Sequence, residues 1–269
     1  MLFLKRSNLC LGKSMAVTAS APNLLEFVSA PFQHRITMGF TRVWDSSCPR
    51  VWDKWESDGT TWVIRDLPPE DDDEAIKILL ENLCTYETLC SLSNVLDDPV
   101  SVQHMVEFGR AGLAQRVSLA CYEEKDGNSK LVALNLCSVI CEGDKDDDVI
   151  EGERWKNVLE ASRLAQNKVD ALKYLGIDKI LCGHGLVVAR EYRGAKLGSR
   201  ILEARTALGL HNGIKGTFSV FTGPASQISA ARAGFKTIAT ITLKELAEAG
   251  LNYPEDESRI LKVMMKKFE

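Results

Sequence analysis

Apolar and polar positions divide most of the chain into short strands and helices. Apolar, β-branched runs of strand length, bounded by turn residues, are typical of buried strands. They occupy seven segments, at residues 61–67, 117–122, 131–141, 179–189, 216–221, 236–243 and 259–268. The second and third of these segments are joined by Lys125-Asp126-Gly127-Asn128, which predicts a hairpin because an Asp-Gly pair suits a tight turn.

Apolar residues at helical spacing fill most of the chain between these strands. A helix should begin after Pro68-Pro69, since proline and the acids that follow suit a first turn. Further helices are expected at about residues 100–114, 153–175, 201–208 and 224–233. Helices interleaved with strands in this order predict an α/β protein with a mixed central sheet flanked by helices.

The composition is that of an ordinary globular protein. The chain has 269 residues, of which 45% are hydrophobic and 26% charged, enough for one large domain or two small ones. The formal net charge of -4 argues against nucleic acid as a partner, because nucleic-acid binders are basic. A membrane is not expected as a partner either, since no apolar run reaches the roughly 18 residues needed for a span.

The chain has eight cysteines and four histidines, and their spacing does not indicate a metal site. Zinc ligands commonly come as Cys-x-x-Cys pairs, and no such pair occurs. Several cysteines fall within predicted strands, as in Leu131–Cys141. Buried free thiols of this kind are typical of a reducing compartment, so we expect a cytoplasmic protein without a metal cofactor.

The first 60 residues differ from the rest of the chain. Residues 1–40 have weak periodicity and are interpreted as a leader lying partly outside the fold. A mitochondrial presequence is the alternative, because Lys5, Arg6 and Lys13 precede any acid. Residues 41–60 carry Trp44, Trp52 and Trp55, which favours an aromatic arm packed on a domain spanning residues 61–269.

A strand, a glycine-bearing loop and a helix follow one another at residues 186–208. The strand ends in Leu186-Val187-Val188, and the loop has two glycines and two cations in the run Arg193-Gly194-Ala195-Lys196-Leu197-Gly198-Ser199. Backbone N–H groups converge at such a helix start, and the helix dipole favours negative charge there. The segment therefore predicts a site for a phosphate-bearing ligand.

This loop resembles the pyrophosphate loop of the GCN5-related N-acetyltransferases, whose pattern is Arg/Gln-x-x-Gly-x-Gly/Ala. Arg193 and Gly198 match its first and last positions, whereas Lys196 stands where the middle glycine is usual. A left-handed lysine there would cost roughly 1 kcal/mol. The late segment 223–235, which ends in Gly-Phe, is also similar to the family's. The resemblance covers residues 60–269 and implies the acetyltransferase fold.

The resemblance also implies acetyl-CoA as co-substrate, bound by residues 186–188 and 193–199. Its pantetheine arm would pair with Leu186-Val187-Val188 like an added strand. Gly183 and Gly185 in the same strand would permit a bulge that opens the sheet. His184 between the two glycines is interpreted as an ordinary strand histidine.

The insect arylalkylamine N-acetyltransferases are the closer resemblance, through Leu67-Pro68-Pro69-Glu70-Asp71 and through Glu87 in Tyr86-Glu87-Thr88-Leu89. It implies that Glu87 is a general base and that Thr222 and Ser226 assist. The alternatives are a solvated glutamate at a helix end and simple helix capping by the two hydroxyls.

Three functions stay open on the sequence. The first is acetyl-CoA-dependent N-acetylation of a small, arylalkylamine-like primary amine with general-base assistance. The second is acetylation of a peptide or polyamine. The third is a degenerate protein that binds acyl-CoA or a partner without catalysis, because Lys196 and the Glu87 segment depart from the family pattern.

Overall fold

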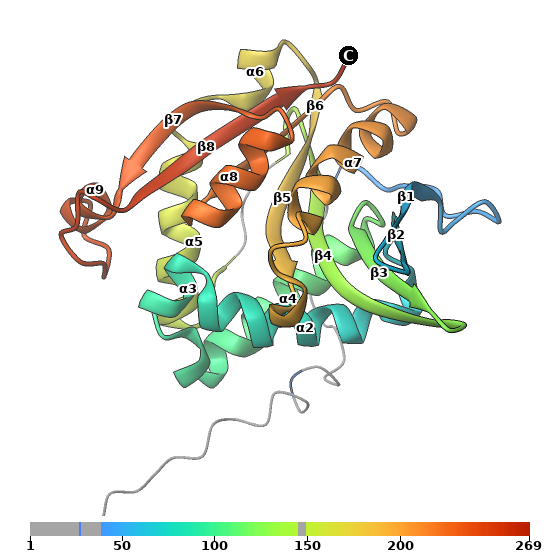
Figure 1. Ribbon diagram of the computed structural model, residues 1–269. Coiled ribbons are helices and arrows are strands. Elements are labelled where there is room, and N and C mark those ends of the chain that lie inside the picture. Colours follow the sequence, from blue (N-terminus) through green and yellow to red (C-terminus); the bar gives the residue numbers. More distant parts are fainter. Residues whose placement is uncertain (1–26, 28–38, 145–148) are drawn as a thin grey trace, which may run out of the picture.

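The computed structural model describes residue 27 and residues 39–144 and 149–269. Its centre is an eight-stranded sheet in the order β1-β2-β3-β4-β5-β6-β8-β7 (Figure 1). The strands are β1 (Val51–Ser57), β2 (Thr60–Asp66), β3 (Leu119–Lys125), β4 (Asn128–Cys141), β5 (Lys179–Val188), β6 (Gly216–Phe221), β7 (Lys236–Thr242) and β8 (Ile260–Lys267). The expected mixed α/β architecture is confirmed.

Helices cover both faces of this sheet. One face carries α7 (Leu197–His211) and α8 (Pro224–Arg232), which lie in front of the strands in Figure 1. The other helices are α2 (Asp72–Tyr86), α3 (Thr88–Leu92), α4 (Pro99–Ala114), α5 (Glu153–Gln166), α6 (Ala171–Leu175) and α9 (Leu243–Glu248). Of these, α2 and α4 pack on β5 and β4, while α5 packs on β6, β7 and β8.

The sheet opens between its fifth and sixth strands. All neighbours are antiparallel except β5 and β6, which run parallel. Their pairing ends at Gly183 and Ser219, although β5 continues to Val188 and β6 to Phe221. We call this separation the splay. Backbone groups of β5 beyond Gly183 are therefore left without β6 as a pairing partner.

A β-bulge in β5 lies at the splay, as the two glycines predicted. Leu136 of β4 pairs with Gly185 and the next residue, Cys137, pairs with Gly183, so His184 is the extra residue. A bulge leaves one residue unpaired and bends the strand locally. It thus gives His184 an orientation that regular strand alternation would not.

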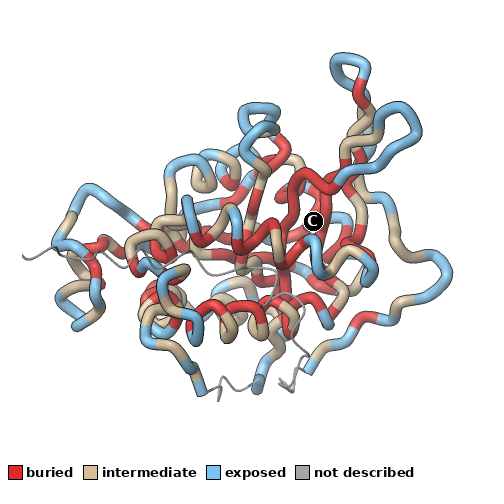
Figure 2. The backbone as a smooth tube through the Cα atoms, turned by 90° about the horizontal axis from the view of Figure 1, so that it is seen from below, coloured by how far each residue is buried: buried red, intermediate tan, exposed pale blue. Residues whose placement is uncertain are grey.

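The buried core lies on both faces of the central strands. Figure 2 shows buried segments concentrated in the middle of the molecule and exposed segments where the chain protrudes from it. On the face covered by α2, α4 and α5, side chains such as Ile76, Leu80 and Leu134 are at most 2% exposed. On the α7 face, Ile64, Leu181 and others are fully buried. Most of the hydrophobic free energy of folding comes from burial of this kind.

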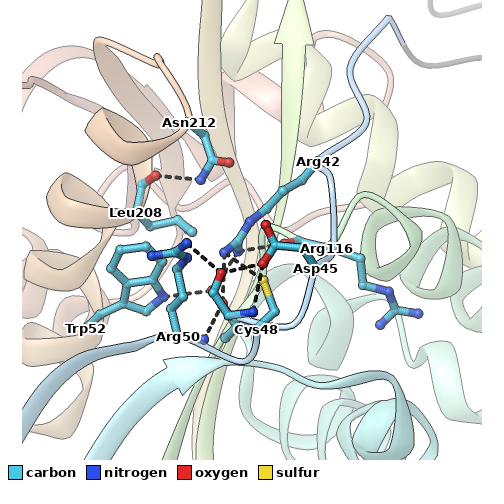
Figure 3. A network of polar contacts seen from close by, with 10 residues as sticks. Arg42, Asp45, Cys48, Arg50, Trp52, Arg116, Leu208 and Asn212 are labelled. Carbon is cyan, nitrogen blue, oxygen red and sulfur yellow. Dashed lines mark hydrogen bonds and ion pairs between the residues drawn. The ribbon is translucent and has the colours of Figure 1, made fainter.

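The segment before β1 is fastened to the sheet through Asp66. Nη1 and Nη2 of Arg42 donate to the two carboxylate oxygens at 2.7 and 2.9 Å, and both side chains are almost fully buried. The backbone N–H of Arg50 and Nε1 of Trp52 donate to the same carboxylate. Figure 3 shows Arg42, Arg50 and Trp52 converging in this network. The predicted aromatic arm therefore contributes both β1 and the hydrogen-bond donors of the buried Asp66 carboxylate. Most of the predicted leader, residues 1–26 and 28–38, lies outside the described residues.

The prediction of one continuous helix over residues 153–175 is wrong, because the structure has two helices there. Helix α5 ends at Gln166, and α6 begins at Ala171 after Asp170 caps it by accepting the Lys173 N–H at 3.0 Å. An aspartate that caps locally competes with a continuous helix. Strand β1 and the helices α3 and α9 were not expected at all.

Candidate active site

A cavity of about 330 Å³ lies at the splay. Gly183, His184 and Gly185 of β5 form one wall, and the end of β6 with the start of α8 forms another. Aromatic and aliphatic side chains of α4 and α5 contribute to its apolar lining, among them Phe108, Trp155, Val158 and Leu159. Largely apolar cavities with a few converging polar groups are typical of small-molecule sites.

All three residues predicted as catalytic, Glu87, Thr222 and Ser226, line this cavity. They come from the junction of α2 and α3 and from the junction of β6 and α8. The Thr222 hydroxyl donates a hydrogen bond to the Glu87 carboxylate, a contact across 135 residues of sequence. The Thr88 hydroxyl donates to the Thr222 carbonyl at 3.1 Å and joins the same two segments.

Glu87 is the N-cap of α3. Its carboxylate accepts the backbone N–H groups of Leu89 and Cys90 at 3.0 and 2.7 Å. With the Thr222 hydroxyl, the carboxylate therefore has three donors and a fixed orientation at the cavity wall. A carboxylate has about four acceptor positions, so one position is left for a further donor such as water or an amine.

The two hydroxyls differ in what they do. Thr222 does not cap α8, whose N-cap is Gly223, so capping is not the role of the Thr222 hydroxyl. Ser226 donates to the Gly223 carbonyl at 2.9 Å, which is a local contact of the first helical turn. The Ser226 oxygen keeps its acceptor positions toward the cavity.

His184 and Ser138 form a further polar pair in the cavity wall. Nε2 of His184 lies 2.6 Å from the Ser138 hydroxyl, and the ring packs edge-on against Phe108. Burial, with a smaller effect of the Arg205 charge, lowers the pKa of His184 to about 4. The imidazole is therefore neutral at physiological pH. The sequence interpretation of His184 as an ordinary strand residue did not place it in the cavity.

Arg205 of α7 lies at the closed end of the splay and also lines the cavity. Its side chain is 1% exposed. Nε donates to Asn135 at 2.7 Å, and Nη1 donates to the hydroxyls of Thr217 and Ser219 at 3.0 Å each. The guanidinium rests on Gly183, where an added Cβ would lie 1.8 Å from Nη2. No sequence pattern had singled out this arginine.

The predicted pyrophosphate loop lies at the far end of β5 and leads into α7. Lys196 has φ +60° and is the N-cap of α7, so the lysine occupies the left-handed conformation that glycine would favour. Gly194 is also left-handed, with φ +91°. The first N–H groups of a helix have no partner within it, and they point out of the N-terminus here. The loop has the backbone geometry of an anion site.

Side chains around the loop at residues 193–199 are also consistent with an anion site. Gly198 lies close to α8, since an added Cβ would be 3.4 Å from the Ser229 hydroxyl. The Ser199 hydroxyl is buried and has no hydrogen-bond partner among the described residues. Arg193 stacks on the Tyr86 ring at 4.7 Å, which brings the loop next to the end of α2 and hence to Glu87.

The structure thus sorts the predicted residues into two neighbouring groups. Leu186 lines the cavity together with Glu87, Thr222 and Ser226. The loop at residues 193–199 stands apart from it, at the carboxyl end of β5. Strand β5 connects the two groups, and its unpaired stretch runs from one to the other.

Two negative findings apply to the described part of the chain. Within residues 39–144 and 149–269, histidine, cysteine, aspartate and glutamate side chains do not form a group of three or more suited to a metal ion. The helices of these same segments are all too short or too polar to cross a membrane.

Solved structures similar to this one include a putative arylalkylamine N-acetyltransferase 7 from the yellow fever mosquito. It is 27% identical, covers 86% of this chain and 100% of its own, and superposes with a TM-score of 0.80. Arylalkylamine N-acetyltransferase 2 from Aedes aegypti (19% identity, 77% and 99% coverage, TM-score 0.66) shares the fold. A Drosophila melanogaster polyamine N-acetyltransferase also shares the fold, with 17% identity, coverage of 77% of this chain and 100% of its own, and a TM-score of 0.62. No protein-family model and no curated protein matches the sequence.

These similarities, added to the splayed sheet and the loop, define the fold of the protein. It has the fold of the GCN5-related N-acetyltransferases. Among proteins of this fold it resembles the insect arylalkylamine N-acetyltransferases, which supports an acetyltransferase enzyme.

Proposed function

We propose that the protein transfers the acetyl group of acetyl-CoA directly to a small primary amine of the arylalkylamine type. The observation that carries the proposal is the cavity at the splay. There Glu87, Thr222 and Ser226 line a space of about 330 Å³, beside a loop suited to pyrophosphate.

Residues 193–199 would hold the pyrophosphate. The open N-terminus of α7 and the cations Arg193 and Lys196 supply donors and positive charge. The unpaired edge of β5 would pair with the amide groups of the pantetheine arm. Five residues, from His184 to Val188, span about 16 Å at 3.3 Å per residue, which is comparable to the length of that arm. The thioester would then lie near Gly183, at the closed end of the splay.

Glu87 would act as the general base for the acceptor. A primary alkylamine has a pKa near 10, so only about one molecule in a thousand is neutral at pH 7, which corresponds to about 4 kcal/mol. A carboxylate in the cavity can bind the ammonium form and take its proton, directly or through water. Thr222 and the α3 backbone hold that carboxylate in place.

The apolar lining favours an acceptor with an aromatic or aliphatic body. Phe108 and Trp155 pack edge-to-face at 5.7 Å and border the cavity, where an aryl group would find similar partners. A polyamine is the second candidate, because Glu107 and Asp144 also line the cavity and could bind a second cationic group. The Drosophila polyamine N-acetyltransferase, which catalyses the formation of N-acetylagmatine, is an enzyme of that kind.

The test is an amine panel with acetyl-CoA and purified protein, with release of the free thiol as the readout. Arylalkylamines, diamines, agmatine and a peptide α-amine would be compared by kcat/KM. Highest kcat/KM for arylalkylamines supports the proposal, and highest values for diamines support the second candidate. Binding of acetyl-CoA without turnover on any amine would support the degenerate, non-catalytic alternative.

A further inference from the structure

Arg205 is a buried cation without an anionic partner among the described residues. Its side chain is 1% exposed, and its hydrogen-bond partners are the neutral groups of Asn135, Thr217 and Ser219. No carboxylate in the part of the chain that the structure describes forms an ion pair with it. A buried charge is costly unless it is paired, and an apolar side chain would be cheaper at a purely structural position.

One nitrogen of the guanidinium group, Nη2, can donate further hydrogen bonds. Nε and Nη1 are bonded as described above, and the guanidinium also acts on the neighbouring Cys137 thiol, whereas Nη2 donates to no oxygen or nitrogen atom of the described residues. Nη2 lies directly over Gly183, because a Cβ at that position would be only 1.8 Å away. Gly183 and Arg205 both line the cavity, so these donors lie at its wall.

The position of this charge along β5 is specific. Gly183 pairs with Ser219 at the last point where β5 and β6 are joined. Ser219 itself receives the Gly183 N–H at 3.2 Å and the Nη1 donor at 3.0 Å. Arg205 therefore marks the closed end of the splay, where the thioester sulfur would lie if the pantetheine arm follows β5 from the loop.

We propose that Arg205 stabilises the thiolate that coenzyme A becomes when the acetyl group leaves. The inference rests on the proposed function, since it requires coenzyme A in the splay. In the transfer to a neutral amine, the carbon–nitrogen bond forms and the carbon–sulfur bond breaks. The electron pair of the broken bond stays on sulfur. Glu87, once it has released the ammonium proton to water, takes the second proton that nitrogen loses. Negative charge thus appears on sulfur beside a fixed, desolvated cation, which is the arrangement that lowers a transition state.

The experiment compares the binding of CoA and of desulfo-CoA, which lacks the thiol, by titration calorimetry from pH 7 to pH 9.5. With the wild-type protein, CoA should bind more tightly than desulfo-CoA, by a ratio that begins to increase at the pKa of the bound thiol and levels off once the free thiol is ionised as well. The increase should already be under way below pH 8.5, the usual pKa of a cysteine thiol. His184, Cys137 and Cys182 are the titratable groups that feel the Arg205 charge. Burial lowers the pKa of His184 to about 4, raises the pKa of Cys182 to about 12 and raises the pKa of Cys137, so a pH dependence between pH 7 and 9.5 is expected to come from the ligand thiol.

Arg205→Gln should reduce that ratio to about one by weakening CoA binding at least about tenfold, as expected for a charge-assisted contact. Its affinity for desulfo-CoA should be unchanged. Arg200→Gln is the matched control, because Arg200 lies on the same helix, pairs with Asp53 at the surface and should leave the ratio at the wild-type value.

Three results would overturn the inference. Equal weakening of both ligands in Arg205→Gln would show that the arginine only supports the fold. Equal affinity of the wild-type protein for CoA and desulfo-CoA at pH 9 would also overturn the inference. This result needs no variant, so it decides the question even if Arg205→Gln does not fold. Failure of the wild-type protein to bind either ligand would remove the proposed function as well, so the two failures are distinguishable.

Discussion

The loop at residues 193–199 and the cavity at the splay differ in how far apart their residues lie in the sequence. The loop is a continuous run of seven residues between β5 and α7. The cavity gathers Glu87, Thr222 and Ser226 from segments about 135 residues apart. A local backbone conformation defines the loop, whereas tertiary packing creates the cavity. Substitutions should therefore separate the two regions, with binding effects in the loop and turnover effects in the cavity.

The largest separation is expected for Glu87→Gln. The amide can no longer take a proton, so kcat should fall about 100-fold or more while the affinity for acetyl-CoA is unchanged. Steady-state kinetics and calorimetric binding of acetyl-CoA would measure the two quantities. Glu81→Gln, an exposed change on the preceding helix α2, should alter neither. Unchanged turnover in Glu87→Gln would exclude the base role.

The cavity should also be the acid-sensitive region. An unfolded histidine has a pKa of about 6.5, and the pKa of His184 in the folded protein is about 4. Between these values the unfolded chain binds more protons, so stability falls as pH decreases from 6.5 to 4, by at most about 3 kcal/mol. Thermal unfolding between pH 4.5 and 7.5 should show a weaker pH dependence in His184→Gln. Identical profiles would contradict the assignment.

In the loop, Arg193→Gln should raise the KM for acetyl-CoA about tenfold and leave kcat at saturation unchanged, because the loss is of ground-state binding. Arg190→Gln, an exposed change in the preceding turn, is the control. A fall in kcat with constant KM would mean that Arg193 acts on the chemistry through its contact with Tyr86, and the contrast between the regions would be lost.

The smallest effect is expected at Lys196, where conformation and charge can be separated. Lys196→Gly should stabilise the protein by up to about 1 kcal/mol, since the left-handed conformation no longer strains a side chain. Lys196→Ala removes the charge and keeps the strain. Both should raise the KM for acetyl-CoA about two- to fivefold through the lost cation. Thermal unfolding and kinetics of the pair would measure the two contributions.

The contrast between a loop defined by local conformation and a cavity created by tertiary packing also explains which features the sequence could predict. The glycines at 183 and 185 predicted the bulge because backbone freedom is a local property. The hairpin at Asp126-Gly127 is also confirmed, with both residues left-handed. An equivalent signal at Asp58-Gly59, likewise left-handed, would have predicted the β1–β2 hairpin, but the polar residues of β1 concealed its strand character.

The cavity contained residues that the sequence patterns did not identify. Arg205 lies on the apolar face of α7, one turn from Ile201 and Leu208, but a charged side chain is usually expected at the surface, and only the absence of a side chain at Gly183 makes room for it in the core. Ser138 lies in an apolar strand, and its partner His184 is 46 residues away. Glu87, Thr222 and Ser226 came from the family resemblance, and their roles remain predictions.

The buried carboxylate of Asp66 sets a lower limit on the length of chain that can fold. Its donors come from Arg42, Arg50 and Trp52, all of which precede the domain boundary suggested at residue 61. A fragment beginning at Thr61 would keep the acid and lose every one of these donors. An uncompensated buried carboxylate costs several kcal/mol, a large part of the stability of an ordinary domain. The smallest autonomous unit of this protein therefore starts ahead of Arg42, and shorter expression fragments should be insoluble or unfolded.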